Sequence, residues 1–194
     1  GGYQYELDTG TSTGFALGAA YEVPQIMLRA SIQYNSEIKH SNAKVTETLG
    51  GAATASSPDD VISPSSMIIK LRSALSPRML AFVNWRSSQY KKLILSGPVH
   101  TAAGQGVIYD PESGTDYTLG VALKVNDSLN VLVGTAKGQA TDTGANESAL
   151  APFKGNTANF IGATFKISDN VEINGGYSLN TLGDATATVP LSTG

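Results

Sequence analysis

The feature that most constrains this chain is a regular alternation of apolar with polar or small residues, which returns eight times along the sequence. In the first of these segments, apolar side chains occupy every second position from Phe15 to Val23, and small residues fill the positions between them apart from Glu22. A period of two residues is typical of a β-strand whose two faces meet different environments. We therefore predict eight strands and no helix, with the strands at residues 15–23, 26–35, 69–75, 79–86, 117–125, 129–136, 159–167 and 171–180.

The connections between these segments alternate between two kinds. Short turns, built from residue types that favour tight reversals, are predicted at residues 23–25, 76–78, 126–128 and 168–170. Long polar loops are predicted between the hairpins, at residues 37–65, 95–116 and 140–158. Transmembrane β-barrels show the same asymmetry, with short periplasmic turns, long extracellular loops and strands of about 9 to 11 residues.

Composition narrows the fold class further. Charged residues make up only 15% of the 194 residues, against about 25% in typical soluble domains. A soluble β-sandwich is the alternative, because it would bury the same apolar faces in a core. Aromatic residues lie near strand ends on the apolar faces, where a membrane interface favours them, at Tyr21, Tyr34, Trp85, Tyr117 and Tyr177. We predict an all-β chain that belongs to an antiparallel transmembrane β-barrel.

Several other classes of protein are excluded or disfavoured. The net charge of −3 gives no electrostatic reason to expect a nucleic-acid partner, and the absence of cysteine excludes disulfides and thiolate sites. No apolar run is long enough for a membrane-spanning helix. The Gly-Thr-Ser-Thr-Gly run at 10–14 matches a nucleophile elbow, but that motif lies between a strand and a helix, and here a strand follows. With His40 and His100 as the only histidines, we expect no enzyme, no metal site and no cofactor.

The direction of the strands bears on how much of a barrel this chain represents. The first predicted strand runs toward the end with short turns and the last runs back, so both chain ends lie on the long-loop side. Bacterial outer-membrane barrels normally begin and end on the periplasmic side. We expect residues 1–194 to form a single segment of a larger up-and-down barrel, whose remaining strands pair with its two edges, since unpaired edges do not persist in lipid.

Two sequence motifs carry a family resemblance. The run AYEVPQIMLRASIQYNSEIKH at 20–40 and the run NWRSSQYKKL at 84–93 resemble the FadL-type transporters of long-chain fatty acids and hydrocarbons. The resemblance implies a fourteen-stranded barrel in the bacterial outer membrane, plugged by an N-terminal hatch. It also implies that this chain covers about the sixth to the thirteenth strands, without the hatch and the last strand. Lipid and lipopolysaccharide are the surroundings that the resemblance implies.

The strand faces opposite the apolar ones carry the candidate ligand-binding residues. A fatty acid requires an apolar pocket and cations for its carboxylate. The predicted inward cations are Arg29, Lys70, Arg72, Arg86 and Lys124, with Glu22 and Glu172 as counter-charges. The predicted inward apolar residues are Met27, Ile68, Leu80, Phe82, Leu132 and Phe160. For each cation, a lumenal ion network that only keeps the wall solvated is an alternative.

The resulting hypothesis is passive uptake of long-chain fatty acids or other hydrophobic compounds across the outer membrane. A structural or adhesive outer-membrane barrel and a general diffusion porin remain alternatives. Apolar residues of the long loop at 37–65 would form either an external capture patch or the loop's own packing: Ile38, Val45, Leu49, Val61 and Ile62. The acidic residues Glu47, Asp59 and Asp60 of that loop would be solvated, bind a divalent ion or bridge lipopolysaccharide.

Overall fold

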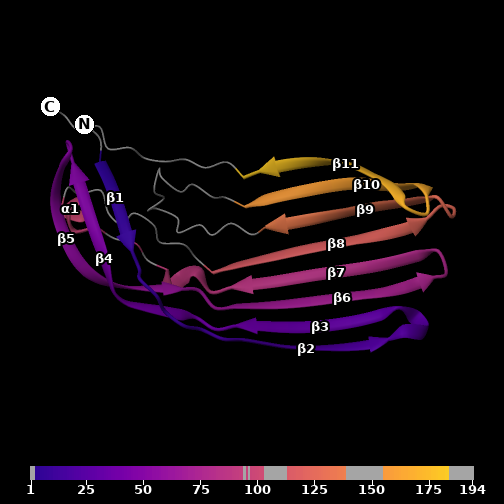
Figure 1. Cartoon of the computed structure of the whole chain (residues 1–194), viewed down its shortest axis with the longest axis horizontal. Helices are drawn as coiled ribbons and strands as arrows, with labels where there is room; N and C mark the ends of the chain where they lie inside the picture. Colours follow the sequence, from indigo (N-terminus) through magenta and orange to yellow (C-terminus); the bar gives the residue numbers. More distant parts are fainter. Residues whose placement is uncertain (1–2, 94, 96, 103–112, 139–154, 184–194) are drawn as a thin grey trace.

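The chain folds into two antiparallel β-sheets of different size (Figure 1). A computed structural model of the chain describes residues 3–93, 95, 97–102, 113–138 and 155–183. The large sheet has eight strands, which run side by side, and the small sheet has three and lies across one end of it (Figure 1). The predicted all-β, antiparallel architecture is confirmed.

The large sheet contains the eight strands that the alternation predicted. In spatial order from one edge to the other they are β11 (Val171–Leu182), β10 (Asn156–Ser168), β9 (Leu129–Gly138), β8 (Gly114–Lys124), β7 (Met79–Ser88), β6 (Ser66–Ser76), β3 (Leu28–Asn35) and β2 (Ala16–Val23). Each strand pairs with its neighbour in sequence except at one place, where β3 pairs with β6 across the insertion of β4 and β5. Within the described residues the sheet does not close, and β2 and β11 are its two edges.

The short turns lie together at the end of the large sheet that is remote from the small one (Figure 1). In the turn between β8 and β9, the side-chain oxygen of Asn126 accepts hydrogen bonds of 2.9 Å from the backbone N–H groups of Ser128 and Leu129. This is the local bonding that makes asparagine favourable in tight reversals. The turn between β2 and β3 is a 3₁₀-helix (Pro24–Ile26), and it ends at Met27 in the left-handed conformation, with φ 51°.

The predicted apolar face of the large sheet is a single exposed layer. It carries Leu17, Ile32, Leu119 and their alternating equivalents, whose side chains are between about 40% and 70% exposed in most of the strands. Among the described residues no second sheet packs on this face, so the sandwich arrangement is not found there. No described helix has the length and apolar character needed to cross a membrane.

The prediction of a long loop at 37–65 is wrong, because these residues form a hairpin of β4 (Ile38–Leu49) and β5 (Ala52–Ser63). Strand β1 (Tyr3–Asp8), which the alternation did not predict, pairs with β4 to complete the small sheet. A register shift follows His40, and Asn42 has a positive φ of 58°, so the less exposed positions change from even to odd numbers within β4. A bulge of this kind breaks the two-residue period on which the prediction depended.

The small sheet contains most of the buried side chains among the described residues. Ala43, Val45 and Val61 are at most 3% exposed, and Glu47 is fully buried beside them. Val45 and Val61 therefore pack inside the hairpin rather than in an external capture patch. Of the acidic residues considered for a divalent ion, Glu47 is enclosed and Asp60 pairs with Lys39 at 2.6 Å, whereas the side chain of Asp59 lies outside the described part of the structure.

The remaining helices are short. A 3₁₀-helix η2 (Tyr90–Lys92) follows β7, and an α-helix α1 (Pro98–Ala102) of five residues contacts β5. The prediction of no helix therefore missed one turn of α-helix. Most of the predicted loops at 95–116 and 140–158 lies outside the described residues.

Candidate functional site

A hollow of about 720 Å³ lies on the face of the large sheet opposite the apolar one, across β2, β3, β6 and β7. We call this the first hollow, and we call the face that carries it the hollowed face. Four of the eight predicted ligand-binding residues line it: Arg29, Lys70, Arg72 and Phe82. Ile68 and Leu80, which were predicted to face inward, line it as well. These six residues therefore border one hollow, and the prediction that any of them binds a ligand stays a prediction.

The cations meet because of the pairing between β3 and β6. In that pairing Arg29 is the cross-strand partner of Arg72, and Ser31 is the partner of Lys70. Arg29 also forms an ion pair with Glu22 of β2, at 3.1 Å, so Glu22 is the predicted counter-charge. Within the described residues, neither Lys70 nor Arg72 makes an ion pair. Three cations against one carboxylate leave an excess of two positive charges at this end of the hollow, which favours an anionic group.

Phe82 and Leu80 supply the apolar side of the first hollow. Phe82 is the cross-strand partner of Arg72 on one side and of Gly120 on the other. A Cβ atom built on Gly120 would lie 2.7 Å from Cζ of Phe82, so the ring lies across the glycine. Any side chain at 120 would displace this ring or the strand, because the carbonyl oxygen of Val133 is equally near.

A second hollow of about 340 Å³ lies on the same face, across β8, β9, β10 and β11. Leu132, a predicted binding residue, lines it together with Ala122 and Gly162. Its polar lining consists of the uncharged side chains Asn130, Thr164 and Asn174. The predicted residue Phe160 lies beside this hollow, with its ring over Gly134.

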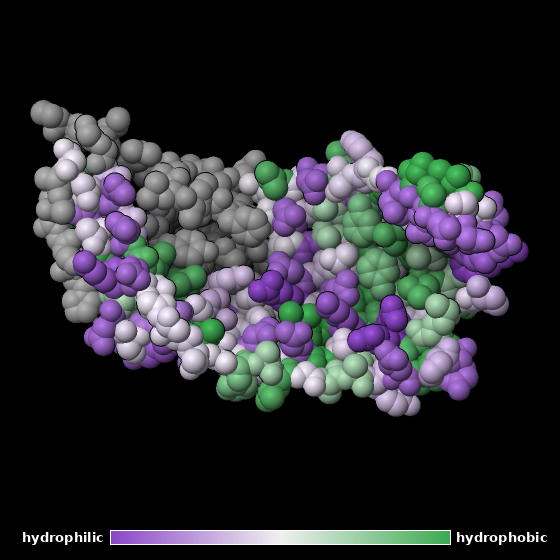
Figure 2. Space-filling view, viewed as in Figure 1, coloured by the Kyte–Doolittle hydropathy of each residue, from purple (hydrophilic) through white to green (hydrophobic). Residues whose placement is uncertain are grey.

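The distribution of polarity on this side of the molecule follows the two hollows (Figure 2). Hydrophobic residues gather over the middle of β8, β9 and β10, and hydrophilic residues border them over β3 and β6 (Figure 2). This side of the sheet therefore presents a hydrophilic region and a hydrophobic region beside each other (Figure 2).

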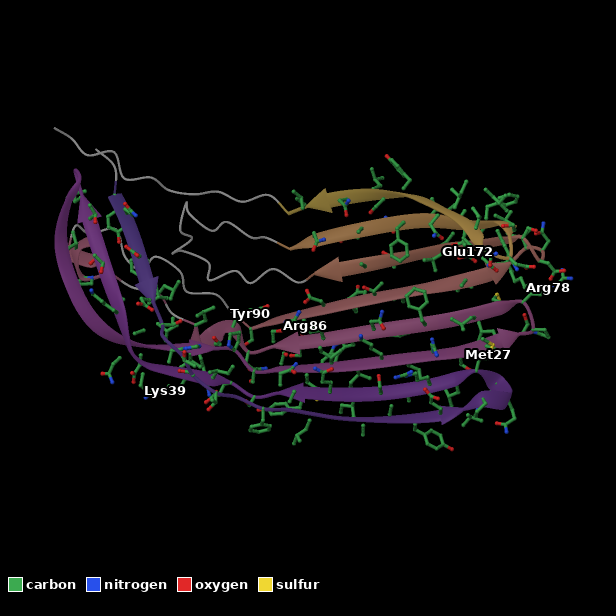
Figure 3. All side chains as sticks on the ribbon, in the orientation of Figure 1. Met27, Lys39, Arg78, Arg86, Tyr90 and Glu172 are labelled. Carbon is green, nitrogen blue, oxygen red and sulfur yellow. The ribbon has the colours of Figure 1, made fainter. Side chains whose placement is uncertain are left out.

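Two predicted cations lie outside both hollows. Arg86 lies near the end of β7 that adjoins the small sheet, where Asp116 of β8 is its cross-strand partner (Figure 3). Lys124 lies at the opposite end, where its ammonium pairs with Asp127 of the turn at 2.7 Å. The sequence period placed both residues on the hollowed face, but it did not indicate their height along the strand.

One further inward assignment, that of Met27, is corrected by the structure, whereas Glu172 shares the face of Thr164 and Asn174. Met27 lies in the turn at the end of the sheet and is 59% exposed (Figure 3), since the left-handed conformation takes it out of the strand alternation. Glu172 lies at the same end and is the cross-strand partner of Lys166, whose ammonium pairs instead with Asp169 at 2.7 Å (Figure 3).

Sequence reasoning missed the uncharged polar residues of the hollows. Ser31, Gln33 and Asn84 line the first hollow, and Asn130, Thr164 and Asn174 line the second. Their positions in the alternation were a sufficient signal for the correct face. Only the register between strands shows which of these polar residues lie level, along the strand direction, with the cations Arg29, Lys70 and Arg72.

The described residues contain one contact between a histidine and a serine, and it lacks the parts of a catalytic triad. Nε2 of His40 lies 3.1 Å from Oγ of Ser63, while Nδ1 of His40 is buried without a hydrogen-bond partner, so no carboxylate orients the ring. The Gly-Thr-Ser-Thr-Gly run lies between β1 and β2, and a strand follows it rather than the helix that a nucleophile elbow requires.

No family model and no curated protein matches the chain in sequence. Solved structures match it in fold. A FadL homologue from Pseudomonas aeruginosa superposes with a TM-score of 0.67 at 17% identity, covering 90% of this chain and 45% of that one. The CymD monoaromatic hydrocarbon channel gives a TM-score of 0.53 at 13% identity, covering 87% and 46% respectively. The TodX ΔS2S3 mutant, also a monoaromatic hydrocarbon channel, gives 0.51 at 15% identity, covering 91% and 49%.

The matches to these three β-barrel structures agree with the single-layer, antiparallel sheet of this chain. The chain spans less than half of the length of each of the three solved structures. At this level of identity the similarity concerns the arrangement of strands. The chain therefore has the fold of part of a FadL-type β-barrel.

Proposed function

We propose that this chain forms part of the wall of a FadL-type barrel in the bacterial outer membrane, and that hydrophobic molecules pass through the barrel without energy input. The observation that carries the proposal is the contrast between the two faces of the large sheet. One face exposes large apolar side chains along all eight strands, and the other carries the two hollows with their cations and small polar residues. A barrel wall between lipid and an enclosed passage requires this contrast.

The two edges of the large sheet support the presence of further strands. Strands β2 and β11 are exposed along nearly their whole length, and each offers one row of unpaired backbone groups to a neighbour. In lipid these groups require partners. We propose that residues 1–194 are one segment of about eight strands, and that the remainder of the same barrel covers both edges. Lipid and lipopolysaccharide would then contact the apolar face.

More specifically, we propose that the protein takes up long-chain fatty acids or related hydrophobic compounds. Its support is the first hollow, where Arg29, Lys70 and Arg72 adjoin Phe82 and Leu80. A carboxylate would bind the cations, and an apolar tail would contact the phenyl and leucine side chains. The proposed role of the protein is transport rather than catalysis, which agrees with the channels that share its fold.

The test uses the full-length protein purified in detergent. Equilibrium binding of palmitate and of toluene is measured, and ion conductance is recorded in planar bilayers. Saturable binding of either compound, with little ion conductance, supports the proposal. Large steady conductance without binding of either would indicate a general diffusion porin. Absence of both binding and conductance would indicate a structural or adhesive barrel.

A further inference from the structure

The apolar face of the large sheet carries a single charged side chain within its eight described strands, that of Lys137. The register places every other charged residue of these strands on the hollowed face. Lys137 is exposed and shares its face with Val133 of the same strand. A charge on the lipid side of a barrel is costly near the middle of the bilayer and costs little near the interface. The position of Lys137 along β9 therefore decides its role.

Lys137 lies at the end of the large sheet that adjoins the small one. Strand β9 runs from the short turns toward the small sheet and ends at Gly138, directly after Lys137 (Figure 1). From Leu129 to Lys137 the strand covers about 26 Å. At a tilt of about 40° this is about 20 Å along the membrane normal, in an apolar band about 25 Å tall. The flexible stem of lysine then carries the ammonium group to the interface.

The side chains beside Lys137 are typical of a membrane interface. Its cross-strand partners are Tyr117 of β8 and Thr157 of β10, and Tyr117 is also the partner of Trp85 in β7. We call Trp85, Tyr117, Lys137 and Thr157 the interface row. Tryptophan and tyrosine favour the headgroup level of a membrane. The interface row therefore lies where lipid headgroups would meet the wall.

Uncharged polar side chains extend this character over β9, β10 and β11. Those on the face of Lys137 are Thr135, Thr157, Asn159 and Thr181. At the end with the short turns, the same face exposes apolar side chains up to the ends of its strands, at Leu123, Ile167 and Val171. Among the described residues, the apolar face thus combines a cation with hydrogen-bonding groups only at the end that adjoins the small sheet.

Lys137 also differs from the lysines of the turn end in having no counter-charge. Within the part of the chain that the structure describes, its ammonium pairs with no carboxylate. Lys124 and Lys166, on the hollowed face, each pair with an aspartate of the adjoining turn at 2.7 Å. An exposed ammonium beside a hydroxyl group suits a phosphate, which accepts charge-assisted hydrogen bonds.

We propose that the interface row binds the phosphorylated headgroup of lipid A, the anionic glycolipid of the outer leaflet. Lys137 binds a phosphate oxygen, Thr157 donates a hydrogen bond to the headgroup, and the acyl chains lie along the apolar face. Charge favours lipid A over a zwitterionic phospholipid, whose phosphate is already neutralised by its own cation. This inference rests on the proposed function, since it requires a barrel in the outer membrane with the small sheet outside.

The experiment measures lipid A binding to the full-length protein in detergent by native mass spectrometry. Lys137→Gln should weaken binding about fivefold, which is the effect of one basic residue near an anionic membrane surface. Lys137→Arg keeps the charge and should bind as the wild type does. Lys166→Gln is the matched control, because it removes an equal charge from the hollowed face, and it should change the affinity by less than about twofold.

Two further measurements identify the phosphate that is bound. Dephosphorylated lipid A should bind equally to the wild type and to Lys137→Gln, and inorganic phosphate should not displace intact lipid A. Equal affinity of the wild type and Lys137→Gln for intact lipid A would overturn the proposal. An equal loss in Lys166→Gln, a loss that persists with the dephosphorylated lipid, or displacement by inorganic phosphate would overturn it as well.

The result can be separated from the proposed transport. Palmitate and toluene should bind equally to all four proteins, because Lys137 lies on the side of the wall opposite the hollows. A wild type that binds either compound, with a lipid A affinity that does not depend on residue 137, refutes the lipid A site alone. A wild type that binds neither compound refutes the transport function, whether or not the lipid A affinity depends on residue 137.

Discussion

The hydroxyl of Tyr3 donates a hydrogen bond of 2.8 Å to Oε1 of Glu47, a carboxylate with no exposed surface. The other oxygen of Glu47 accepts a hydrogen bond of 2.8 Å from the backbone N–H of Val99, at the start of α1. Gly97 lies against the same carboxylate, where a side chain would overlap it. One buried acid thus connects β1, the hairpin and the helix, which are far apart in sequence.

Removing the Tyr3 hydroxyl should destabilise the small sheet. Tyr3→Phe leaves a buried carboxylate with one partner fewer, and the expected cost is about 1–3 kcal/mol. Hydrogen exchange of the β1 and β4 amides should accelerate, while amides of the large sheet keep their protection. Glu6→Gln, an exposed change in the same strand, is the matched control and should have no effect. Equal exchange in both variants would contradict a structural role for the Tyr3–Glu47 contact.

The same contact should respond to alkaline pH. Burial raises the pKa of Tyr3 above its ordinary value of 10.0, and the hydrogen bond to Glu47 raises it further. The folded state therefore holds the phenolic proton more tightly than the unfolded state, so the stabilisation is complete below pH 10 and is lost as the pH rises above it. The difference in small-sheet stability between the wild type and Tyr3→Phe should shrink above pH 10. A difference that stays constant would exclude this linkage.

Asp60 should titrate at unusually low pH. Its carboxylate accepts a hydrogen bond from the ammonium of Lys39, at 2.6 Å, and another from the backbone N–H of Asn42, at 3.3 Å, and both lower its pKa below the ordinary 3.8. The stabilisation is present above pH 3.8 and is lost as the pH falls through the folded value. Carboxyl NMR titration checks this. Lys39→Met should raise the pKa, whereas Lys44→Met on the same strand should leave it unchanged.

The turn of the hairpin in the small sheet requires left-handed backbone. Gly50 and Gly51 have φ values of 65° and 90°, and a Cβ atom at either position would meet open space. Substitutions there consequently act through backbone strain alone. Gly50→Val should destabilise the hairpin by about 1–2 kcal/mol, while Gly50→Asn should be tolerated, since asparagine adopts this conformation readily. Thermal unfolding of the two variants, monitored at the small sheet, distinguishes them.

Adjacent residues on β8 test which face meets lipid. Leu119 is exposed on the apolar face, and Thr118 is its neighbour on the hollowed face. If the barrel spans a membrane, Leu119→Arg should cost about 2–4 kcal/mol near the middle of the bilayer, whereas Thr118→Arg should cost much less. Urea unfolding of the full-length protein in lipid vesicles measures both. Similar costs for the two variants would argue against lipid on the apolar face.

The sequence by itself determined the eight strands of the large sheet and the face on which most of their side chains lie, with Met27 in the turn as an exception. A strand's period is local, so Phe82 and Arg72 could be assigned to the same face without coordinates. Strand β4 was missed because the register shift after His40 and the positive φ of Asn42 interrupt the period. Strand β1 was missed because six residues give too short a pattern without the partner that stabilises them.

Only the tertiary structure decided which side chains meet. The pairing of β3 with β6 passes over a whole hairpin, and it brings Arg29 beside Arg72 although 43 positions separate them, since 72 less 29 is 43. The register likewise aligns Phe82 with Gly120 and Phe160 with Gly134. Alternation is a property of neighbouring residues, whereas register depends on contacts between distant strands. For that reason the sequence predicts the face of the sheet on which a side chain lies, whereas the positions of the hollows depend on the pairing of the strands.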